Sequence, residues 1–281
     1  MVRKNKEKPT EATPCRLVSP LRTHGGKHYL APRIVALMPK HTHYLEAYSG
    51  GLSVLLAKPC EGVAEYVNDL NGELMNFWMV VSAPELFEKF ERRMECVPLS
   101  EPLFTHTGEG IESGRYTGTV ESAMAFFVRA RMSRQGLGKD YCTPTRRTRR
   151  GMNENVSAWL SAIDGLPDIH ARLRRVEVWN RPAVEAIRKL DQENLLTFCD
   201  PPYLHSTRST KKEYGEYEMT EAQHVELLEC LRDMKGKFML SGYPSELYDS
   251  FDFNRVEFKI ANSASSSAKK EVKTEVVWMN F

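Results

Sequence analysis

Apolar residues recur along the chain with two different periods, which predict a mixture of strands and helices. Short apolar runs bounded by turn residues predict strands at 43–47, 65–68, 176–179, 195–199, 237–241, 255–260 and 274–280. Apolar residues spaced three or four apart predict helices at 29–38, 53–58, 73–82, 84–95, 121–133, 153–163, 181–190 and 220–234. Because strands and helices alternate at both ends of the chain, we expect an α/β fold. The last two strands predict a hairpin-like edge of the sheet around a loop at 262–270.

The alternation of strands and helices is interrupted in the middle of the chain. There, three predicted helices are separated by Gly- and Thr-rich sequence such as 105–119, which predicts irregular structure. We therefore expect an inserted, mainly helical domain at 83–170 between the two parts of one α/β domain, 15–82 and 171–281. Residues 1–14 are mostly polar with little to bury, and we expect a mobile basic tail there.

Composition places the chain among folded globular proteins. Its 281 residues are 41% hydrophobic and 27% charged, which are ordinary values for a protein with a buried core. No apolar run is long enough to cross a bilayer, and no apolar run follows the basic N-terminus, so we expect neither a signal peptide nor membrane association. The six scattered cysteines include no C-x-x-C pair and no histidine at zinc-finger spacing, which predicts reduced thiols, a cytoplasmic protein and no metal site.

The segment Asp200-Pro201-Pro202-Tyr203 directly follows the apolar strand at 195–199. Open α/β sheets bind ligands at the carboxyl ends of their parallel strands. Two prolines fix φ and remove two backbone donors, which leaves carbonyl oxygens for other partners. A carboxylate beside such a carbonyl can accept both hydrogens of an exocyclic amine, and a tyrosine offers a face on which a base can stack. The segment therefore predicts a site for the amino group of a nucleobase; the alternative is an ordinary Asp-Pro turn after a buried strand.

Three further segments place glycines or a charged residue at turns near the predicted strands. A Gly-Gly-Lys turn ends at Lys27, Gly50 and Gly51 follow the first strand, and Asp69 ends the second strand. Glycines allow a ligand to approach the backbone closely, and an acid at a strand end can accept hydrogen bonds from ribose hydroxyls. The alternatives are a solvated lysine and an aspartate that caps the next helix. Because the glycine pair is not G-x-G-x-x-G, a nicotinamide enzyme is disfavoured.

These segments, in this order, resemble the motifs of the Dam-like adenine-N6 DNA methyltransferases. More narrowly, they resemble the branch in which the cofactor motifs come first and the Asp-Pro-Pro-Tyr motif comes last. The resemblance implies a Rossmann-like sheet of the S-adenosylmethionine-dependent methyltransferase type, with an inserted domain that recognises the DNA target. It covers the sheet domain and is much weaker across the middle of the chain.

The resemblance also implies roles for individual residues. The segment 20–27 is similar to the first cofactor segment of the family, in which Lys27 matches the lysine that contacts the cofactor and Thr23 stands at the aromatic position. The segment 44–53 is similar to the glycine-rich cofactor loop, with Ala-Tyr in place of the usual Pro-Phe. The implied cofactor-binding residues are Thr23, Lys27, Glu46, Gly50, Gly51, Asp69 and Asp200. The implied catalytic residues are Asp200, Pro201, Pro202 and Tyr203.

Basic residues are concentrated between positions 129 and 150, although the net charge of the whole chain is only +2. Within that stretch Asp140 is the single acid. Arginine dominates over lysine, which suits bidentate contacts to phosphates and to guanine edges. A solvated face is the alternative, but beside a site for a base amine a DNA-binding surface explains the cluster better. The predicted DNA-binding residues are Arg129, Arg131, Arg134, Lys139, Arg146, Arg147, Arg149 and Arg150.

Taken with these patterns, the resemblance implies a site-specific enzyme that transfers the methyl group of S-adenosylmethionine to N6 of an adenine flipped out of double-stranded DNA. The same grip on an amine would suit cytosine N4 or adenine in RNA, and a non-catalytic DNA-binding regulator on the same fold is a further alternative. We expect a cytoplasmic, DNA-associated monomer of bacterial or phage origin. The sequence leaves open whether a cognate restriction endonuclease accompanies it.

Overall fold

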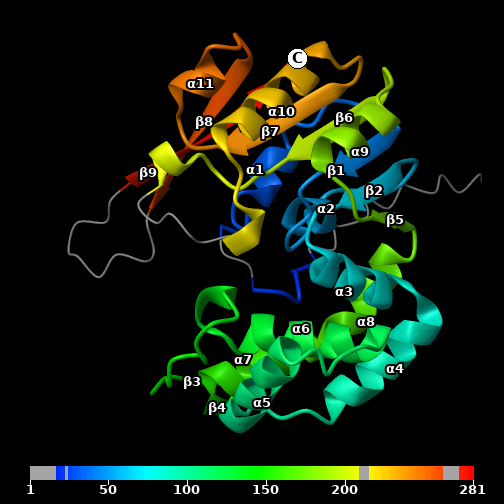
Figure 1. Cartoon of the computed structure of the whole chain (residues 1–281), viewed down its shortest axis with the longest axis vertical. Helices are drawn as coiled ribbons and strands as arrows, with labels where there is room; N and C mark the ends of the chain where they lie inside the picture. The colour runs from blue at the N-terminus through cyan, green and yellow to red at the C-terminus, as the bar shows by residue number, and fades with distance from the viewer. Residues whose placement is uncertain (1–16, 23–24, 209–214, 262–271) are drawn as a thin grey trace, which may run out of the picture.

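The fold consists of one large sheet with its helices and a helical unit beside it (Figure 1). The computed structural model describes residues 17–22, 25–208, 215–261 and 272–281. The predicted tail at 1–14, the candidate residue Thr23 and the predicted loop at 262–270 lie outside these residues. Within the described ranges, the structure contains no helix with the length and apolar character needed to cross a bilayer.

Seven strands form the large sheet in the order β5-β2-β1-β6-β7-β9-β8. Neighbouring strands are parallel, except that β9 runs antiparallel to both β7 and β8. The strands are β1 (His43–Glu46), β2 (Ala64–Asn68), β5 (Val176–Trp179), β6 (Leu195–Cys199), β7 (Lys237–Gly242), β8 (Asn254–Ala261) and β9 (Val272–Met279). All seven strands coincide with those predicted from the sequence, and the Rossmann-like α/β fold is confirmed.

Different helices cover the two faces of the sheet. Successive residues of a strand point to opposite faces, so Tyr44 and Leu45 of β1 belong to separate apolar cores. The core around Tyr44 is covered by α1 (Ala31–Val35), α2 (Ser53–Ala57) and α3 (Gly72–Ser82). The core around Leu45 is covered by α9 (Ala183–Leu190), α10 (Glu221–Asp233) and α11 (Glu246–Asp249).

The last two strands form an antiparallel pair at one edge of the sheet, as predicted. Of the two, β9 lies inside the sheet, between β7 and β8, and β8 lies at the edge. The reason is visible in their side chains. Residues 276–279 of β9 are apolar and buried, which suits the interior of a sheet, whereas Arg255, Glu257 and Lys259 of β8 are exposed and charged, which suits an edge.

The residues between α3 and β5 form the helical unit that lies beside the sheet (Figure 1). Its elements are α4 (Pro84–Glu95), α5 (Glu101–Glu112), α6 (Thr119–Met132), the hairpin β3 (Thr148–Arg149) and β4 (Met152–Asn153), α7 (Glu154–Asp164) and α8 (Leu166–Leu173). This unit shares one core with the sheet domain. Phe77 of α3 stacks on Phe127 of α6 with ring centres 5.7 Å apart, and buried Trp159 of α7 belongs to the same core.

Three elements of this unit differ from the sequence prediction. The segment 105–119 was expected to be irregular, but α5 continues to Glu112. Ser100 caps the start of this helix, and its glycines lie where neighbouring side chains leave no room for a Cβ. A Cβ on Gly108 would come within 2.7 Å of the Arg129 side chain, and one on Gly110 within 2.5 Å of Tyr116. The pattern also failed to predict α8, which has 8 residues, and the β3–β4 hairpin, whose strands have 2 residues each, because these elements are shorter than the stretch of sequence over which a period can be recognised.

A buried ion triad joins the helical unit to the sheet. Glu65 on β2 is 2% exposed, and its carboxylate accepts two hydrogen bonds from Arg172 of α8, at 2.6 and 2.7 Å. Lys58, which follows α2, donates to the same carboxylate at 2.7 Å, and Arg172 also donates to the Leu55 carbonyl at 3.2 Å. Because buried charges are stable only when they are paired and hydrogen-bonded, these contacts hold α8 against β2 and α2.

Replacement of Arg172 by alanine tests the structural role of this triad. The Glu65 carboxylate would stay buried with one cation fewer, so we expect the free energy of unfolding to fall by roughly 3 kcal/mol, measured by urea denaturation. The control is Arg175→Ala, which removes an exposed ion pair with Glu61 and should change the free energy of unfolding by less than about 1 kcal/mol. Equal losses in the two variants would contradict the assignment.

Candidate functional site

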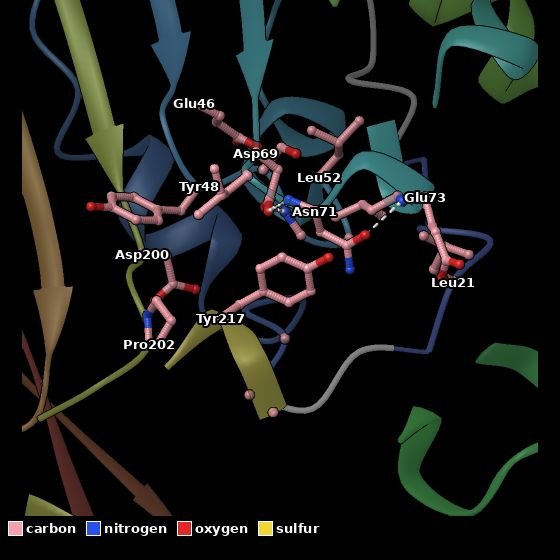
Figure 2. Close-up of a pocket in the computed structure, with 18 of the residues that line it drawn as sticks. Leu21, Glu46, Tyr48, Leu52, Asp69, Asn71, Glu73, Asp200, Pro202 and Tyr217 are labelled. Atoms are coloured by element: carbon pink, nitrogen blue, oxygen red, sulfur yellow. Dashed lines mark hydrogen bonds between the residues drawn. The ribbon is translucent and has the colours of Figure 1, made fainter. Parts of the chain in front are cut away.

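Three acidic side chains meet at the carboxyl edge of the parallel strands. Glu46 is the last residue of β1, which pairs in parallel with β2 and β6, and Asp69 and Asp200 directly follow the ends of those two neighbours. All three line a cavity of about 860 Å³ together with Lys27, and Figure 2 shows them around it. In the described part of the chain, no three His, Cys, Asp or Glu side chains are grouped to hold a metal ion. The structure thus gathers candidate residues that the sequence placed far apart.

The turn after β1 is tied to the end of β2. Gly50 has a φ of +43° and Leu52 a φ of 55°, so the chain bends sharply there. The Gly50 N–H donates to one oxygen of Asp69 at 3.2 Å, and the Asn71 N–H donates to the other at 3.0 Å. Asn71, not Asp69, caps α3, because its side chain accepts the Leu74 N–H. Burial raises the pKa of Asp69 in spite of these backbone donors.

Glu46 is deeply buried at the base of the cavity, with 2% of its surface exposed. One of its oxygens accepts the Tyr44 hydroxyl at 3.0 Å and the Leu55 N–H at 2.6 Å. Burial, together with the charge of Asp200, raises the pKa of Glu46 to about 8 against the opposing effect of these bonds. At neutral pH Glu46 is therefore mostly protonated, and a protonated carboxyl can donate a hydrogen bond as well as accept one.

Lys27 lies directly against Asp200. Its ammonium nitrogen is 2.9 Å from one Asp200 carboxylate oxygen, and that oxygen also accepts the Ser241 hydroxyl at 2.7 Å. The Lys27 side chain is 4% exposed, whereas the Asp200 side chain is 21% exposed. The ion pair therefore buries the lysine but leaves the carboxylate partly open to the cavity.

The four residues of the Asp-Pro-Pro-Tyr segment are placed differently. Asp200 and Pro202 line the cavity, and Figure 2 shows both beside Tyr217. Pro201 and Tyr203 are buried and do not belong to the cavity lining among the described residues. The backbone of the segment thus follows the cavity wall, while alternate side chains pack into the protein.

Tyr203 is held by three side chains from other parts of the chain. Its hydroxyl donates to Glu275 of β9 at 2.6 Å. The Lys27 ammonium lies 4.8 Å from the centre of its ring, and Tyr243 packs edge-to-face against it with ring centres 4.7 Å apart. The orientation of this ring is therefore set by contacts that no local sequence pattern reveals.

The structure adds Tyr217, Ser241 and Glu275 to the residues that the sequence assigned to the site. Tyr217 ends the short helix η3 (Gly215–Tyr217), and its ring lies between Asp200 and Asn71 in Figure 2. Burial, with a hydrogen bond to Glu216, raises the pKa of Tyr217 to about 12. The residues around Tyr217 in the sequence are polar and form no pattern that identifies it as a site residue. Glu275, by contrast, is an acid beside a fully apolar run of its strand, and this is a signal that could have found it.

The predicted basic surface divides into two groups. Arg129, Arg131 and Arg150 donate hydrogen bonds to carbonyls of the helical unit, and burial lowers the pKa of Arg131 to about 10. The other five predicted residues are exposed: Arg134, Lys139, Arg146, Arg147 and Arg149. Arg150 and Gly151 have φ values of 54° and 73°, as in a tight two-residue turn between β3 and β4. Arg149 lies on β3 directly before this turn, and Arg146 and Arg147 precede β3.

Comparison with known proteins gives one family and two relatives. The model of the family described as D12 class N6 adenine-specific DNA methyltransferase matches residues 24–272. The chain is 25% identical over 271 residues to the Type II methyltransferase M1.LlaDCHI of Lactococcus lactis subsp. cremoris, and the match covers 92% of this chain and 93% of that protein. It is also 25% identical over 288 residues to the Type II methyltransferase M.FokI of Planomicrobium okeanokoites, covering 94% of this chain but 43% of that protein.

Glu46→Gln tests the protonation of the buried acid. Because the pKa of Glu46 is near 8 in the folded chain and near 4.5 in the unfolded chain, the folded state retains a proton that the unfolded state loses between these values. The parent therefore loses stability relative to Glu46→Gln as the pH rises from about 5 to about 8. Urea denaturation of both proteins at the two pH values measures the difference, and a constant difference would contradict the raised pKa.

Proposed function

Because the chain belongs to the family of D12 class N6 adenine-specific DNA methyltransferases, we propose that it transfers the methyl group of S-adenosylmethionine to N6 of an adenine flipped out of double-stranded DNA. Methylation of adenine in DNA is the activity of the family. The finer proposal is carried by the cavity in which Asp200 lies beside Lys27 and shares the wall with Asp69. A base inside a duplex does not reach such a cavity, so it must leave the stack at a cost of a few kcal/mol.

The residues of the cavity fit the chemical groups of S-adenosylmethionine. Lys27 offers an ammonium group for the methionine carboxylate, and Asp69 offers a carboxylate for the ribose hydroxyls. Gly50 and Gly51 line the cavity and allow a close approach of the ligand to the backbone. When bound, the donor supplies a sulfonium methyl group as the electrophile.

Asp200 and the Pro201 carbonyl would hold the two hydrogens of the adenine amine. This grip directs the nitrogen lone pair out of conjugation with the ring and toward the methyl group. Ser241 supports the role of Asp200, since its hydrogen bond orients the carboxylate. Because the electrophile is already reactive, the contribution of the protein is positioning and electrostatic stabilisation.

Tyr203 would stack on the target base. Lys27 lies over its ring and against Asp200, so it occupies the space that the base needs. We therefore expect Lys27 to turn toward the donor carboxylate before the base enters. This makes binding of the donor a condition for productive binding of the adenine.

The helical unit at 83–170 would recognise the DNA target. Three of its exposed basic residues, Arg146, Arg147 and Arg149, lie on β3 or directly before it, where phosphates can reach them. The related proteins are named Type II methyltransferases, which supports a cognate restriction endonuclease as a partner in the cell. We propose that the chain acts on DNA as a monomer.

Asp200→Ala removes the proposed acceptor for the amine. We expect incorporation of a labelled methyl group into plasmid DNA to fall by at least about a hundredfold, with N6-methyladenine as the product of the parent in nucleoside mass spectrometry. Asp164→Ala, at an exposed site in the helical unit, is the control and should retain the parent rate. Equal incorporation by parent and Asp200→Ala would end the catalytic assignment.

Arg147→Ala and Arg149→Ala test the DNA surface. Each should lower the slope of log affinity against log salt concentration by about 1, because each removes one phosphate contact. Fluorescence anisotropy with duplex DNA over a series of salt concentrations measures the slope. Arg92→Ala, an exposed arginine of α4, is the matched control. A slope identical to that of the parent in both hairpin variants would rule out the proposed surface.

A further inference from the structure

Glu275 is a buried carboxylate beside the catalytic segment that the proposed function leaves without a role. It lies on β9, is 6% exposed and pairs in register with Phe258 of β8. The next four residues of its strand are apolar and buried. A carboxylate in such surroundings is costly unless polar groups contact it, so its partners decide what it does.

The contacts of Glu275 lead to Tyr203 and to Lys27, the lysine that pairs with Asp200. Its Oε2 atom accepts the Tyr203 hydroxyl at 2.6 Å and lies 3.9 Å from the Lys27 ammonium nitrogen. The same ammonium is 2.9 Å from Asp200 and 4.8 Å from the centre of the Tyr203 ring. The buried carboxylate of Glu275 thus contacts both Tyr203 and Lys27, and Lys27 in turn pairs with Asp200.

The hydrogen bond from the Tyr203 hydroxyl to Glu275 restricts rotation of the Tyr203 side chain, which the backbone does not restrict. Pro201 and Pro202 already limit the chain before Tyr203, but its ring can still rotate about its side-chain bonds. Tyr243 packs edge-to-face against the ring. A hydroxyl that donates to a carboxylate forms a stronger bond than one between neutral groups, so Glu275 supplies a directional anchor for the ring.

We propose that Glu275 is a positioning residue for methyl transfer and acts through the Tyr203 hydroxyl. It holds the ring in the orientation in which its face meets the target adenine beside Asp200. This role rests on the proposed function of Asp200 and Tyr203. Loss of the anchor lowers the fraction of bound adenines that are aligned for reaction.

The first test compares Glu275→Ala with Glu275→Gln, which keeps an acceptor oxygen. We expect kcat to fall about tenfold in Glu275→Ala, the loss that corresponds to about 1.4 kcal/mol, and to stay within about threefold of the parent in Glu275→Gln. The Kd for S-adenosylhomocysteine, measured by calorimetry, should change by a similar factor in both, because each removes the charge that lies 3.9 Å from the Lys27 nitrogen, so only the loss of the hydroxyl anchor separates their kcat values. Glu257→Ala on neighbouring β8 removes an exposed glutamate and is the matched control, with parent kcat and Kd.

The second test is a double-mutant cycle with Tyr203→Phe, which keeps the ring and removes the hydroxyl. If Glu275 acts through that hydroxyl, Tyr203→Phe alone should lower kcat by a similar factor, and adding Glu275→Ala should lower it less than about twofold further. Losses that multiply would overturn the proposal. Should Glu275→Ala fail to fold, Tyr203→Phe alone decides: a parent kcat in this variant would overturn the proposal, and a loss of about tenfold supports it.

Asp200→Ala separates this proposal from the proposed function. If Asp200→Ala is inactive while Tyr203→Phe and Glu275→Ala both retain the parent kcat, the positioning role alone is wrong. If Asp200→Ala retains activity, the proposed function itself is wrong.

Discussion

The site depends on the buried ammonium group of Lys27, which lies close to two carboxylates. Lys27 is nearly buried, and Asp200 and Glu275 both lie within 4 Å of its nitrogen, at 2.9 and 3.9 Å. Burial, together with the charge of Asp200, raises the pKa of Glu46 to about 8, so this acid is mostly neutral beside the ion pair of Lys27 and Asp200. Protonation of Glu46 therefore lowers the total negative charge of the acidic side chains that line the cavity.

The helical unit and the cavity are joined by more than a linker. Asn71 caps α3 beside Asp69, and Phe77, further along the same helix, stacks on Phe127 of the helical unit. On the other side, Arg172 ties α8 to Glu65 of β2, the strand that ends at the cavity. A rigid helix and a buried ion pair thus connect the proposed DNA-recognition unit to the wall that would hold the ribose. The shared apolar core makes independent motion of the two parts costly.

The sequence predicted the elements that carry a clear apolar pattern. It failed where glycines suggested a loop inside a helix and where an element was too short to show a pattern. All seven strands of the large sheet carry runs of apolar residues and were predicted. Gly108 and Gly110 suggested a loop, yet they lie in α5, where a close approach of Arg129 and Tyr116 requires the absence of a Cβ. Candidate site residues at the strand ends lie together because parallel strands share one carboxyl edge, whereas Tyr217 follows from no pattern in its own segment.

The sequence by itself determined the order of the motifs, the α/β class and the chemistry that an Asp-Pro-Pro-Tyr turn after a buried strand can perform, because these depend on residues that are close in the chain. Only the tertiary structure decided which partners those residues have. Tyr203 and Glu275 are 72 positions apart, and they meet because β9 pairs between β7 and β8. In the same way, Arg129, Arg131 and Arg150 belong to the basic run but donate to backbone carbonyls, and for the partly buried Arg129 and Arg131 such partners offset the cost of burying a charge. The spacing of apolar residues reflects neighbours that are close in the sequence, whereas strand order and packing bring together residues from distant parts of the chain.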